Sequence, residues 1–404
     1  MKIEIPAFVR ELMQVLSGAG EESYIVGGSL RDSLLGKSPD DYDLATSADP
    51  ARMCEVFADY RVIETGLKHG TLTVICDGHP VEITAFRVDG GYTDSRHPDS
   101  VSFTRSIEED LARRDFTVNA MAYNCERGLV DLFGGQEDLG ARVIRAVGEP
   151  ERRFGEDALR IMRAFRFSAQ LGFEIEKGTL LAAESCREGL YNIARERIAT
   201  EFFKLLASDG AQSALLQMRD SNILDCVLCG RIPSERLISL VCELPRSAAA
   251  RFGFLLCEYS EADAREVIAS LKCSNEQKKT ALAAFRGASI LVREQKDTSR
   301  LLCELGGNAR YALCASIVLG LSARETLEWL ESDHAPHSIS ELAVNGGDMM
   351  RIGFYGRDIG EVLSYLLSRA IDSPEINDRE SLLALAKEKY REKEGIKDAR
   401  ERYN

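Results

Sequence analysis

The sequence contains no run of about 20 apolar residues, which is the length that a membrane-spanning helix requires. Its opening segment, MKIEIPAFVRELMQVL, mixes charged with apolar residues and so differs from the unbroken apolar core of a signal peptide. The chain also lacks an excess of positive charge, because 65 acidic residues outnumber 51 Lys and Arg. We therefore expect a cytoplasmic protein without membrane contact that does not bind nucleic acid indiscriminately, since such binding depends on excess cations.

A paired cysteine framework is also missing. The eleven cysteines stand singly along the chain, and Cys226 and Cys229 form the one CxxC. A structural zinc site would need a second such pair, and the five histidines show no metal-ligand spacing. We therefore expect reduced thiols and no zinc site.

The distribution of β-rich and helical patterns predicts an α+β fold. A chain of 404 residues is too long for one hydrophobic core. Short β-rich runs such as SYIVGG, GTLTVIC and GLVDLF lie between residues 23 and about 140, and apolar residues recur at helical spacing from about residue 142 onward. We expect a small mixed sheet with helices, followed by all-helical parts. Gly and Pro breaks near residues 148–150, 208–210, 232–233 and 305–307 are the expected joints. Together with the change of pattern near residue 142, they lead us to divide the chain into residues 1–140, 141–207, 208–305 and 306–404.

A Gly-Gly turn lies at the start of the first part. In SYIVGGSLRDSLLG a β run ends at Gly27 and Gly28, and a helical segment opens at Ser29. Glycine lets the backbone approach a phosphate, a new helix offers unpaired N–H groups, and Arg31 adds a charged fork. The segment predicts a triphosphate cradle, although a Gly-Gly pair by itself is more often only a turn.

Two aspartates follow in the β run DDYDLAT. Alternate side chains of a strand share one face, so Asp41 and Asp43 are expected to lie together. Two adjacent carboxylates repel each other unless a cation lies between them. Mg²⁺ binds a few carboxylate oxygens together with substrate phosphates, and two such ions could activate a 3′-hydroxyl and steady a leaving pyrophosphate. The pair predicts Mg²⁺-dependent nucleotide transfer to an RNA 3′ end; an exposed acidic turn is the alternative.

Glu82, in the β run VEITAFRV, is the candidate third catalytic carboxylate. Its position beside the aspartates depends on a strand register that the sequence does not fix. A surface strand residue is therefore the alternative.

A third motif, EEDLARRDFTVNAMAY, precedes an apolar run that we expect to be helical. Arg114 is suited to clamping a triphosphate, while Asp115 or Asn119 is suited to meeting a ribose hydroxyl. Surface salt bridges between these arginines and the acidic residues 108–110 are the alternative.

The segment RRFGEDALRIMRAFRF carries a charged residue at every third position: Asp157, Arg160, Arg163 and Arg166. On a helix these residues form a polar ridge opposite an apolar side, in a stretch crowded with arginine. Cytosine and adenine each present an amine donor beside a ring-nitrogen acceptor, and guanine and uracil present the reverse order. We predict that Asp157 and Arg160 select CTP and ATP and that the ridge holds phosphates; a solvated helix face is the alternative.

Four segments together, VGGSLRDSLLG, DDYDLAT, EEDLARRDFTVNAMA and EDALRIMRAFRF, resemble the bacterial class II tRNA nucleotidyltransferases, the CCA-adding enzymes. The resemblance is dense from about residue 20 to 200 and returns in LAVNGGDMMRIGFYGRDIGEVLSYLL near the end. It implies a polymerase β-type nucleotidyltransferase head, then a helical neck, body and tail that hold the acceptor arm of tRNA. The implied reaction adds C, C and A to the tRNA 3′ end from CTP and ATP and releases pyrophosphate.

The resemblance also implies roles for individual residues. It gives the metals to Asp41 and Asp43, and it gives nucleotide binding and base recognition to Gly28, Arg31, Arg114, Asp157, Arg160, Arg163 and Arg166. Family members that add only CC look shortened where this chain has the full-length segment 89–106, which favours addition of the terminal A. The His-Asp dipeptide of the phosphohydrolase domain in some relatives is absent.

Three alternative functions stay open. An A-adding enzyme that works beside a CC-adding partner would have the same motifs. A bacterial poly(A) polymerase resembles the same head, but the family-like tail and the lack of a long basic extension disfavour it. An inactive RNA-binding protein could keep the fold, although intact Asp41 and Asp43 argue against it. The sequence does not indicate an oligomeric state.

Overall fold

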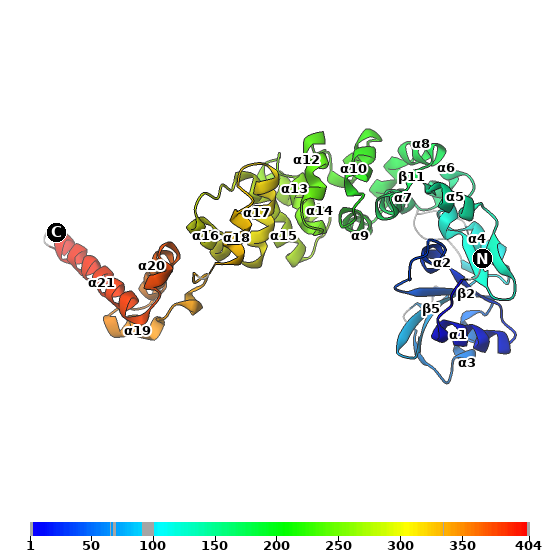
Figure 1. The fold of residues 1–404 in the computed structure, drawn as a ribbon, viewed down its shortest axis with the longest axis horizontal. Helices are drawn as coiled ribbons and strands as arrows, with labels where there is room; N and C mark the ends of the chain where they lie inside the picture. The colour runs from blue at the N-terminus through cyan, green and yellow to red at the C-terminus, as the bar shows by residue number, and fades with distance from the viewer. Residues whose placement is uncertain (1–2, 65, 68–69, 91–100, 334, 402–404) are drawn as a thin grey trace. The chain divides into compact units, whose positions relative to one another are not determined.

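Two units make up the chain, Met1–Ile232 and Pro233–Asn404 (Figure 1). The computed structural model describes residues 3–64, 66–67, 70–90, 101–333 and 335–401. The boundary between the units coincides with the Gly and Pro break at residues 232–233. The division of the chain into four parts stays a prediction.

A mixed β-sheet forms the centre of the first unit. Its described strands follow the order β3-β4-β5-β2-β1-β8-β9, and β2 pairs with β5 in parallel while the other neighbours are antiparallel. The strands are β1 Ser23–Val26, β2 Tyr42–Thr46, β3 Arg61–Ile63, β4 Thr71–Cys76, β5 His79–Ala85, β8 Met121–Asn124 and β9 Gly128–Asp131. The predicted α+β class with a small mixed sheet is confirmed.

The prediction of a helical run after Asn119 is wrong. A 3₁₀ turn, η2 (Thr117–Asn119), leads into strand β8, which lies between β1 and β9. All four residues of β8 are buried. A strand that is covered on both faces lacks the alternation of apolar and polar residues that distinguishes a strand from a helix.

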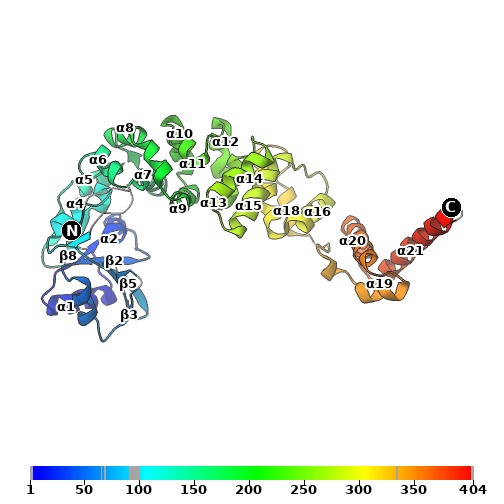
Figure 2. The ribbon, with the colours of Figure 1, turned by 180° about the vertical axis from the view of Figure 1, so that it is seen from behind.

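Helices cover the sheet. α1 (Ala7–Gly18) buries Val9, Leu12 and Leu16 and contacts β1 and β4. Figure 2 shows α1 beside the strands of the sheet. α4 (Ile107–Ala112) joins the cluster that includes Tyr24 of β1. α2 (Gly27–Leu34) and α3 (Pro50–Val56) complete this part, and α2 contacts β1, β2 and β8. The first turn of α2 therefore lies at the end of β1, beside β2.

Two further strand pairs are described in the first unit: β6 (Arg87–Asp89) is antiparallel to β7 (Val101–Phe103), and β10 (Val143–Ile144) is parallel to β11 (Glu174–Ile175). The part of this unit that follows β9 is otherwise mainly helical. Its helices are α5 Gly135–Ala141, α6 Pro150–Glu156, α7 Leu159–Leu171, α8 Lys177–Ser185, α9 Arg195–Leu206, α10 Ala211–Asp220 and α11 Ile223–Leu228.

The continuous helix expected through EDALRIMRAFRF is interrupted. Asp157 has an extended backbone (φ −145°, ψ 103°), and it lies between α6 and α7. Its Oδ1 accepts a hydrogen bond from the backbone N–H of Leu159 at 3.0 Å. Aspartate commonly caps a helix start in this way, so it ends one helix and begins the next.

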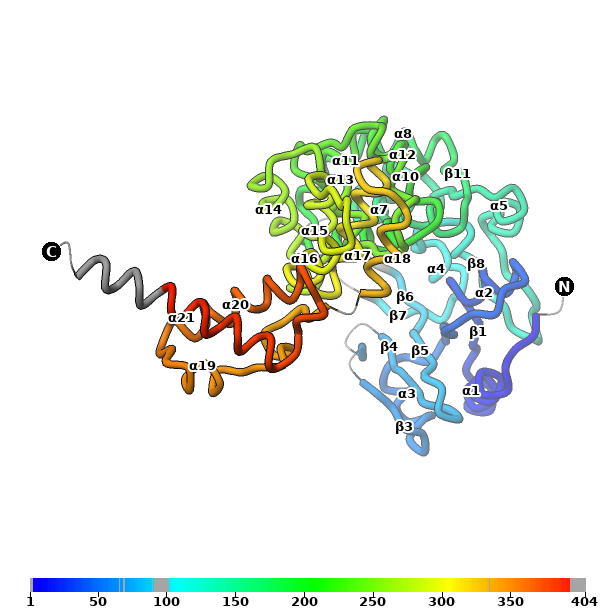
Figure 3. Tube along the Cα trace, turned by 60° about the vertical axis from the view of Figure 1, so that its left-hand side comes forward, coloured from blue at the N-terminus to red at the C-terminus, as the bar shows by residue number. Residues whose placement is uncertain are grey.

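The second unit consists of helices (Figure 3). They are α12 Glu235–Leu240, α13 Ala248–Leu255, α14 Glu261–Ser270, α15 Asn275–Arg286, α16 Gln295–Leu305, α17 Ala309–Val318, α18 Thr326–Glu331, α19 Gly346–Ile352, α20 Arg357–Asp372 and α21 Arg379–Glu401. Within the described part of the chain, none of the helices combines the length and apolar character needed to span a bilayer.

Close backbone contact between α13 and α15 depends on Gly253. A Cβ atom at this position would lie 1.8 Å from the carbonyl oxygen of Ala281. We expect Gly253→Ala to destabilise the protein by about 1–3 kcal/mol, the usual range for an overpacked core, and to lower the midpoint of thermal unfolding.

Gly360→Ala provides the matched control. Gly360 is also helical, in α20, but a Cβ atom there meets nothing within 4 Å. Because alanine favours helix more than glycine does, this variant should unfold at the wild-type temperature or slightly above it. Equal midpoints for the two variants would contradict the packing described for Gly253.

Candidate functional site

Three carboxylates gather at the start of β2. Asp43 of β2 lies in register with Glu82 of the parallel neighbour β5, so the two side chains share one face of the sheet. Asp41 is exposed and lies in a bend just before β2, not within the strand as expected. Burial, together with the charges of Glu82 and Asp41, raises the pKa of Asp43 to about 6, against the opposing charge of Arg114.

This carboxylate group suits a divalent cation. Its donors are all oxygen atoms, which hard cations such as Mg²⁺ and Ca²⁺ prefer. Among the described residues, three ligand atoms lie within 4.8 Å of one another at Glu11, Cys76 and Asp77, which is a different place. The oxygen atoms of Asp41, Asp43 and Glu82 are not gathered that tightly, so these carboxylates do not form a closed cage. An open site of this kind leaves room for phosphate oxygens as further ligands.

At Gly27 the backbone lies close to the guanidinium of Arg114 and to the carboxylate of Asp43. α2 begins at Gly27, two residues earlier than expected. Gly27 has φ +67°, and a Cβ atom there would lie 3.4 Å from Arg114 Nη1 and 3.7 Å from Asp43 Oδ2. The left-handed backbone favours glycine here, and both distances are ordinary van der Waals contacts, so the cradle lies directly against the two side chains.

Ser29 connects the start of α2 to β2. Its hydroxyl donates to the carbonyl of Val26 at 2.9 Å and accepts the backbone N–H of Asp43 at 3.3 Å. A Cβ atom at Gly28 would lie 3.6 Å from Arg31 Nη2. The predicted cradle residues therefore lie directly beside the carboxylate group.

Arg31 and Arg114 are held by acidic neighbours and by Asn119. Arg31 donates to both carboxylate oxygens of Asp32, at 2.9 and 3.0 Å, and to Asn119 Oδ1 at 2.9 Å. Arg114 donates to Asp110 Oδ2 at 3.0 Å. Burial raises the pKa of Asp110, but Arg114 and Arg113 outweigh it, and the net shift is downward. Salt bridges between these arginines and the acidic residues 108–110 were the alternative to nucleotide binding. The pair of Arg114 with Asp110 is thus present, but it is buried and not at the surface.

Asp115 is the buried centre of a network. It accepts hydrogen bonds from the backbone N–H of Phe116 at 2.8 Å, from Asn119 Nδ2 at 3.3 Å and from Arg163 Nε at 2.7 Å. Burial raises its pKa, but Arg163 outweighs this effect and the pKa falls to about 2. Asp115 therefore stays ionised and joins the η2 turn to α7.

Arg31 and two arginines of the ridge contact the same aromatic ring. Arg31, Arg163 and Arg166 lie over Phe167, with guanidinium carbons 5.4, 5.3 and 3.8 Å from the ring centroid. Arg166 also pairs with Glu201 of α9 at 2.5 Å. Cation–π contacts hold such groups in a fixed plane.

The Arg160 guanidinium does not contact the Asp157 carboxylate among the described hydrogen bonds and ion pairs, and the two residues are joined only by a backbone hydrogen bond, from the N–H of Arg160 to the carbonyl of Asp157, at 3.0 Å. Arg160 Nη1 donates to Glu156 at 2.7 Å and to the carbonyl of Arg153 at 2.9 Å, and its Nη2 donates to the carbonyl of Arg113 at 3.1 Å. The helix break separates the two predicted template residues, because the backbone changes direction at Asp157.

The sequence pattern did not identify the residues that hold the ridge. Glu201 lies on α9, a helix outside the four motifs. Asp110 holds Arg114 outside the ridge, and its spacing of four residues from Arg114 is compatible with a helical pair. Pairs between distant segments leave no such periodic signal in a single sequence.

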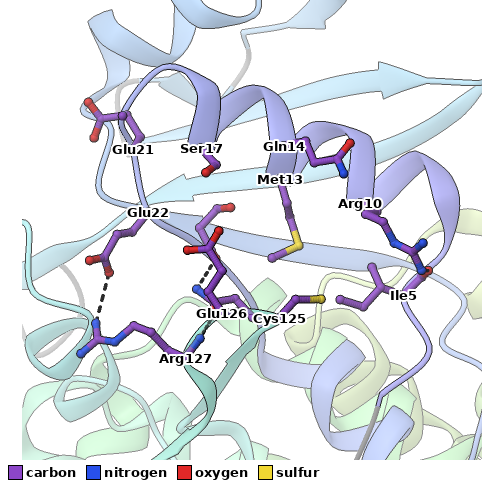
Figure 4. Close-up of a pocket in the computed structure, with 13 residues that line it drawn as sticks. Ile5, Arg10, Met13, Gln14, Ser17, Glu21, Glu22, Cys125, Glu126 and Arg127 are labelled. Atoms are coloured by element: carbon purple, nitrogen blue, oxygen red, sulfur yellow. Dashed lines mark hydrogen bonds and ion pairs between the residues drawn. The ribbon is translucent and has the colours of Figure 1, made fainter.

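A separate pocket of about 450 Å³ lies along α1 (Figure 4). Its lining includes Arg10, Met13 and Cys125, and Glu22 pairs with Arg127 at its edge at 3.2 Å. None of the residues predicted for catalysis or nucleotide binding lines it.

Comparison with known proteins places this arrangement in a family. A family model described as the poly A polymerase head domain matches residues 23–145, and one described as a probable RNA and SrmB-binding site of polymerase A matches residues 172–237. The chain is 36% identical to the CCA-adding enzyme of Limosilactobacillus fermentum, across 96% of this chain and 99% of that protein.

Solved structures give the same result. The CCA-adding enzyme of Bacillus stearothermophilus in complex with CTP superposes with a TM-score of 0.82 at 30% identity, covering 97% of this chain and 100% of that one. The Thermotoga maritima CCA-adding enzyme complexed with tRNA has the same fold, with a TM-score of 0.67 at 21% identity over 96% of this chain and 99% of that one. Members of this nucleotidyltransferase family are generally metal-dependent. The chain belongs to the family of CCA-adding enzymes and is a nucleotidyltransferase.

Proposed function

We propose that this protein adds C, C and A to the 3′ end of tRNA from CTP and ATP without a nucleic-acid template. One observation carries the proposal: the carboxylates of Asp41, Asp43 and Glu82 adjoin the cradle at Gly27 and Arg114. A cation site and a phosphate site are therefore contiguous, as nucleotide transfer requires. The relatives named above support the choice of reaction.

In this reaction the 3′ oxygen of tRNA bonds to the α-phosphorus of the nucleotide while the bond to pyrophosphate breaks. We propose Mg²⁺ as the metal, held by Asp41 and Asp43 with Glu82 as the third catalytic carboxylate. When bound, Mg²⁺ would favour ionisation of the attacking hydroxyl and offset negative charge on the phosphates.

The cradle residues bind the nucleotide. The backbone N–H groups of Gly27, Gly28 and Ser29 are at the start of α2, where a phosphate is favoured, and Arg114 supplies the positive charge beside them. Arg31 fixes the cradle through Asn119.

We propose that the ribose and the triphosphate of the nucleotide contact the hydrogen-bonded network around Asp115. Asp115 or Asn119 accepts a hydrogen bond from the ribose, while Arg163 and Arg166 add positive charge from α7. Because these groups are already paired with one another, they are held in place before the nucleotide binds.

Asp157 and Arg160 select the base. Both Asp157 oxygens already accept one hydrogen bond, and a carboxylate oxygen has two lone pairs, so each can accept another from an exocyclic amine. Arg160 uses three of its five N–H donors in described bonds, which leaves donors for a ring nitrogen. This arrangement favours cytosine and adenine over uracil and guanine.

The helical parts are proposed to hold the tRNA. Residues 1–140 would form the nucleotidyltransferase head, and residues 141–207, 208–305 and 306–404 would form neck, body and tail around the acceptor arm. Because tRNA and nucleoside triphosphates are the substrates, we propose that the reaction takes place in the cytoplasm.

Three tRNA transcripts test the proposed reaction: one ending before CCA, one ending after the two C residues, and one with complete CCA. With Mg²⁺, CTP and ATP, we expect three, one and no added nucleotides, read from product length. Extension of the middle transcript alone would indicate an A-adding enzyme. Untemplated long A tails would indicate a poly(A) polymerase, and no extension would indicate an inactive RNA-binding protein.

Asp41→Ala should lower the rate of nucleotide addition on the order of a thousandfold, because metal assistance contributes several kcal/mol to the transition state. Asp41 is exposed, so the thermal unfolding midpoint measured without Mg²⁺ should stay unchanged. Asp40→Ala is the matched control, since this exposed neighbour is outside the carboxylate group and should retain full activity. Equal rates for the two variants would rule out Asp41 as a metal ligand.

Asp157→Ala should relax the choice of nucleotide. We expect the ratio of kcat/KM for CTP over UTP to fall about tenfold or more, because one hydrogen bond to a charged acceptor is lost. Glu151→Ala, at an exposed position of α6, is the control and should leave the ratio unchanged. An unaltered ratio for Asp157→Ala would show that this carboxylate does not read the base.

A further inference from the structure

Asp157 is held by a residue outside the motifs. Its Oδ1 accepts the backbone N–H of Leu159 at 3.0 Å, and its Oδ2 accepts Nη2 of Arg197 at 3.1 Å. In the described part of the chain, the bond from Arg197 is the one side-chain hydrogen bond to this carboxylate. The Asp157 side chain is 16% exposed and that of Arg197 is 32% exposed, so water only partly competes for the bond.

Arg197 lies on the face of α9 that meets the ridge. Glu201 follows it by four residues, one helical turn later, and therefore projects from the same face. Glu201 pairs with Arg166 at 2.5 Å and lies 4.0 Å from Arg163. One face of α9 thus contacts both the helix break at Asp157 and the arginines of α7.

The guanidinium of Arg197 is not fully satisfied. Its Nη1 is buried and has no hydrogen-bond partner among the described residues. A buried donor without a partner is unfavourable, and buried groups of this kind are uncommon in folded proteins. The side-chain hydrogen bond that fixes this guanidinium among the described residues is therefore its bond to Asp157.

We propose that Arg197 is a positioning residue for nucleotide choice, which rests on the proposed role of Asp157 in selecting the base. A charge-assisted hydrogen bond fixes the rotamer of the Asp157 carboxylate, so that its remaining lone pairs stay in one orientation. Without Arg197, the carboxylate keeps only the bond from Leu159 and rotates more freely. The acceptor is still present, but it meets the amine of cytosine or adenine less often.

The test compares Arg197→Gln with Arg197→Lys, Asp157→Asn and the double variant Arg197→Gln/Asp157→Asn. The measured quantity is the ratio of kcat/KM for CTP over UTP on a tRNA transcript ending before CCA. For Arg197→Gln we expect the ratio to fall about tenfold, and Arg197→Lys should recover part of it because its ammonium keeps the charge. The double variant should be no less selective than Asp157→Asn, since Arg197 acts through Asp157.

Arg195→Gln is the matched control on the same helix. Arg195 donates to the backbone carbonyls of Cys226 and Val227 at the end of α11, not to Asp157. Its loss should affect thermal unfolding but leave the CTP to UTP ratio unchanged. If Arg197→Gln fails to fold, Arg197→Lys decides: a reduced ratio in this folded variant supports the positioning role, and a wild-type ratio overturns it.

The outcomes separate the two proposals. If Asp157→Asn lowers the ratio while Arg197→Gln leaves it unchanged, or if their effects simply add, Arg197 does not position Asp157 and the proposed role of Asp157 stands. If Asp157→Ala, which removes the acceptor altogether, leaves the ratio unchanged, the role of Asp157 is wrong and the inference about Arg197 is overturned with it.

Discussion

The buried ion pair between Asp115 and Arg163 is the interaction on which the candidate site depends. It connects the η2 turn to α7, and through Asn119 it also fixes Arg31 at the start of α2. Removing one partner of such a pair leaves an uncompensated charge, at a cost of about 3–5 kcal/mol when the pair is fully buried. The Arg163 side chain is 34% exposed, so the cost here falls toward the lower end of that range.

The other arginines of the site are likewise held by acidic residues. Asp110 holds Arg114, Glu156 holds Arg160, and Glu201 holds Arg166. Long cationic side chains would otherwise lose much rotamer entropy when they meet a triphosphate. Here that loss occurs during folding, which leaves more of the binding energy for the reaction itself.

The sequence was most informative where one short segment carries the chemistry. Gly27, Asp43 and Arg114 could be recognised because turn glycines, alternating strand residues and adjacent arginines have local physical meanings. The sequence left open the features that depend on distant partners. The register that places Glu82 beside Asp43 and the contact of Arg197 with Asp157 join segments that are far apart in the chain. The helix break at Asp157 was missed because a capping aspartate also fits a helical pattern.

The parallel pairing of β2 with β5 has a consequence for how the protein folds. β4 and β5 form a hairpin through the short turn at residues 77–78, and this local unit must then dock against β2. Docking brings the carboxylate of Glu82 to that of Asp43, so like charges oppose the pairing of β2 with β5. A divalent cation bound between them would relieve this repulsion and would bind only the assembled sheet. By mass action, the same ion that serves the chemistry would therefore stabilise the fold of the head.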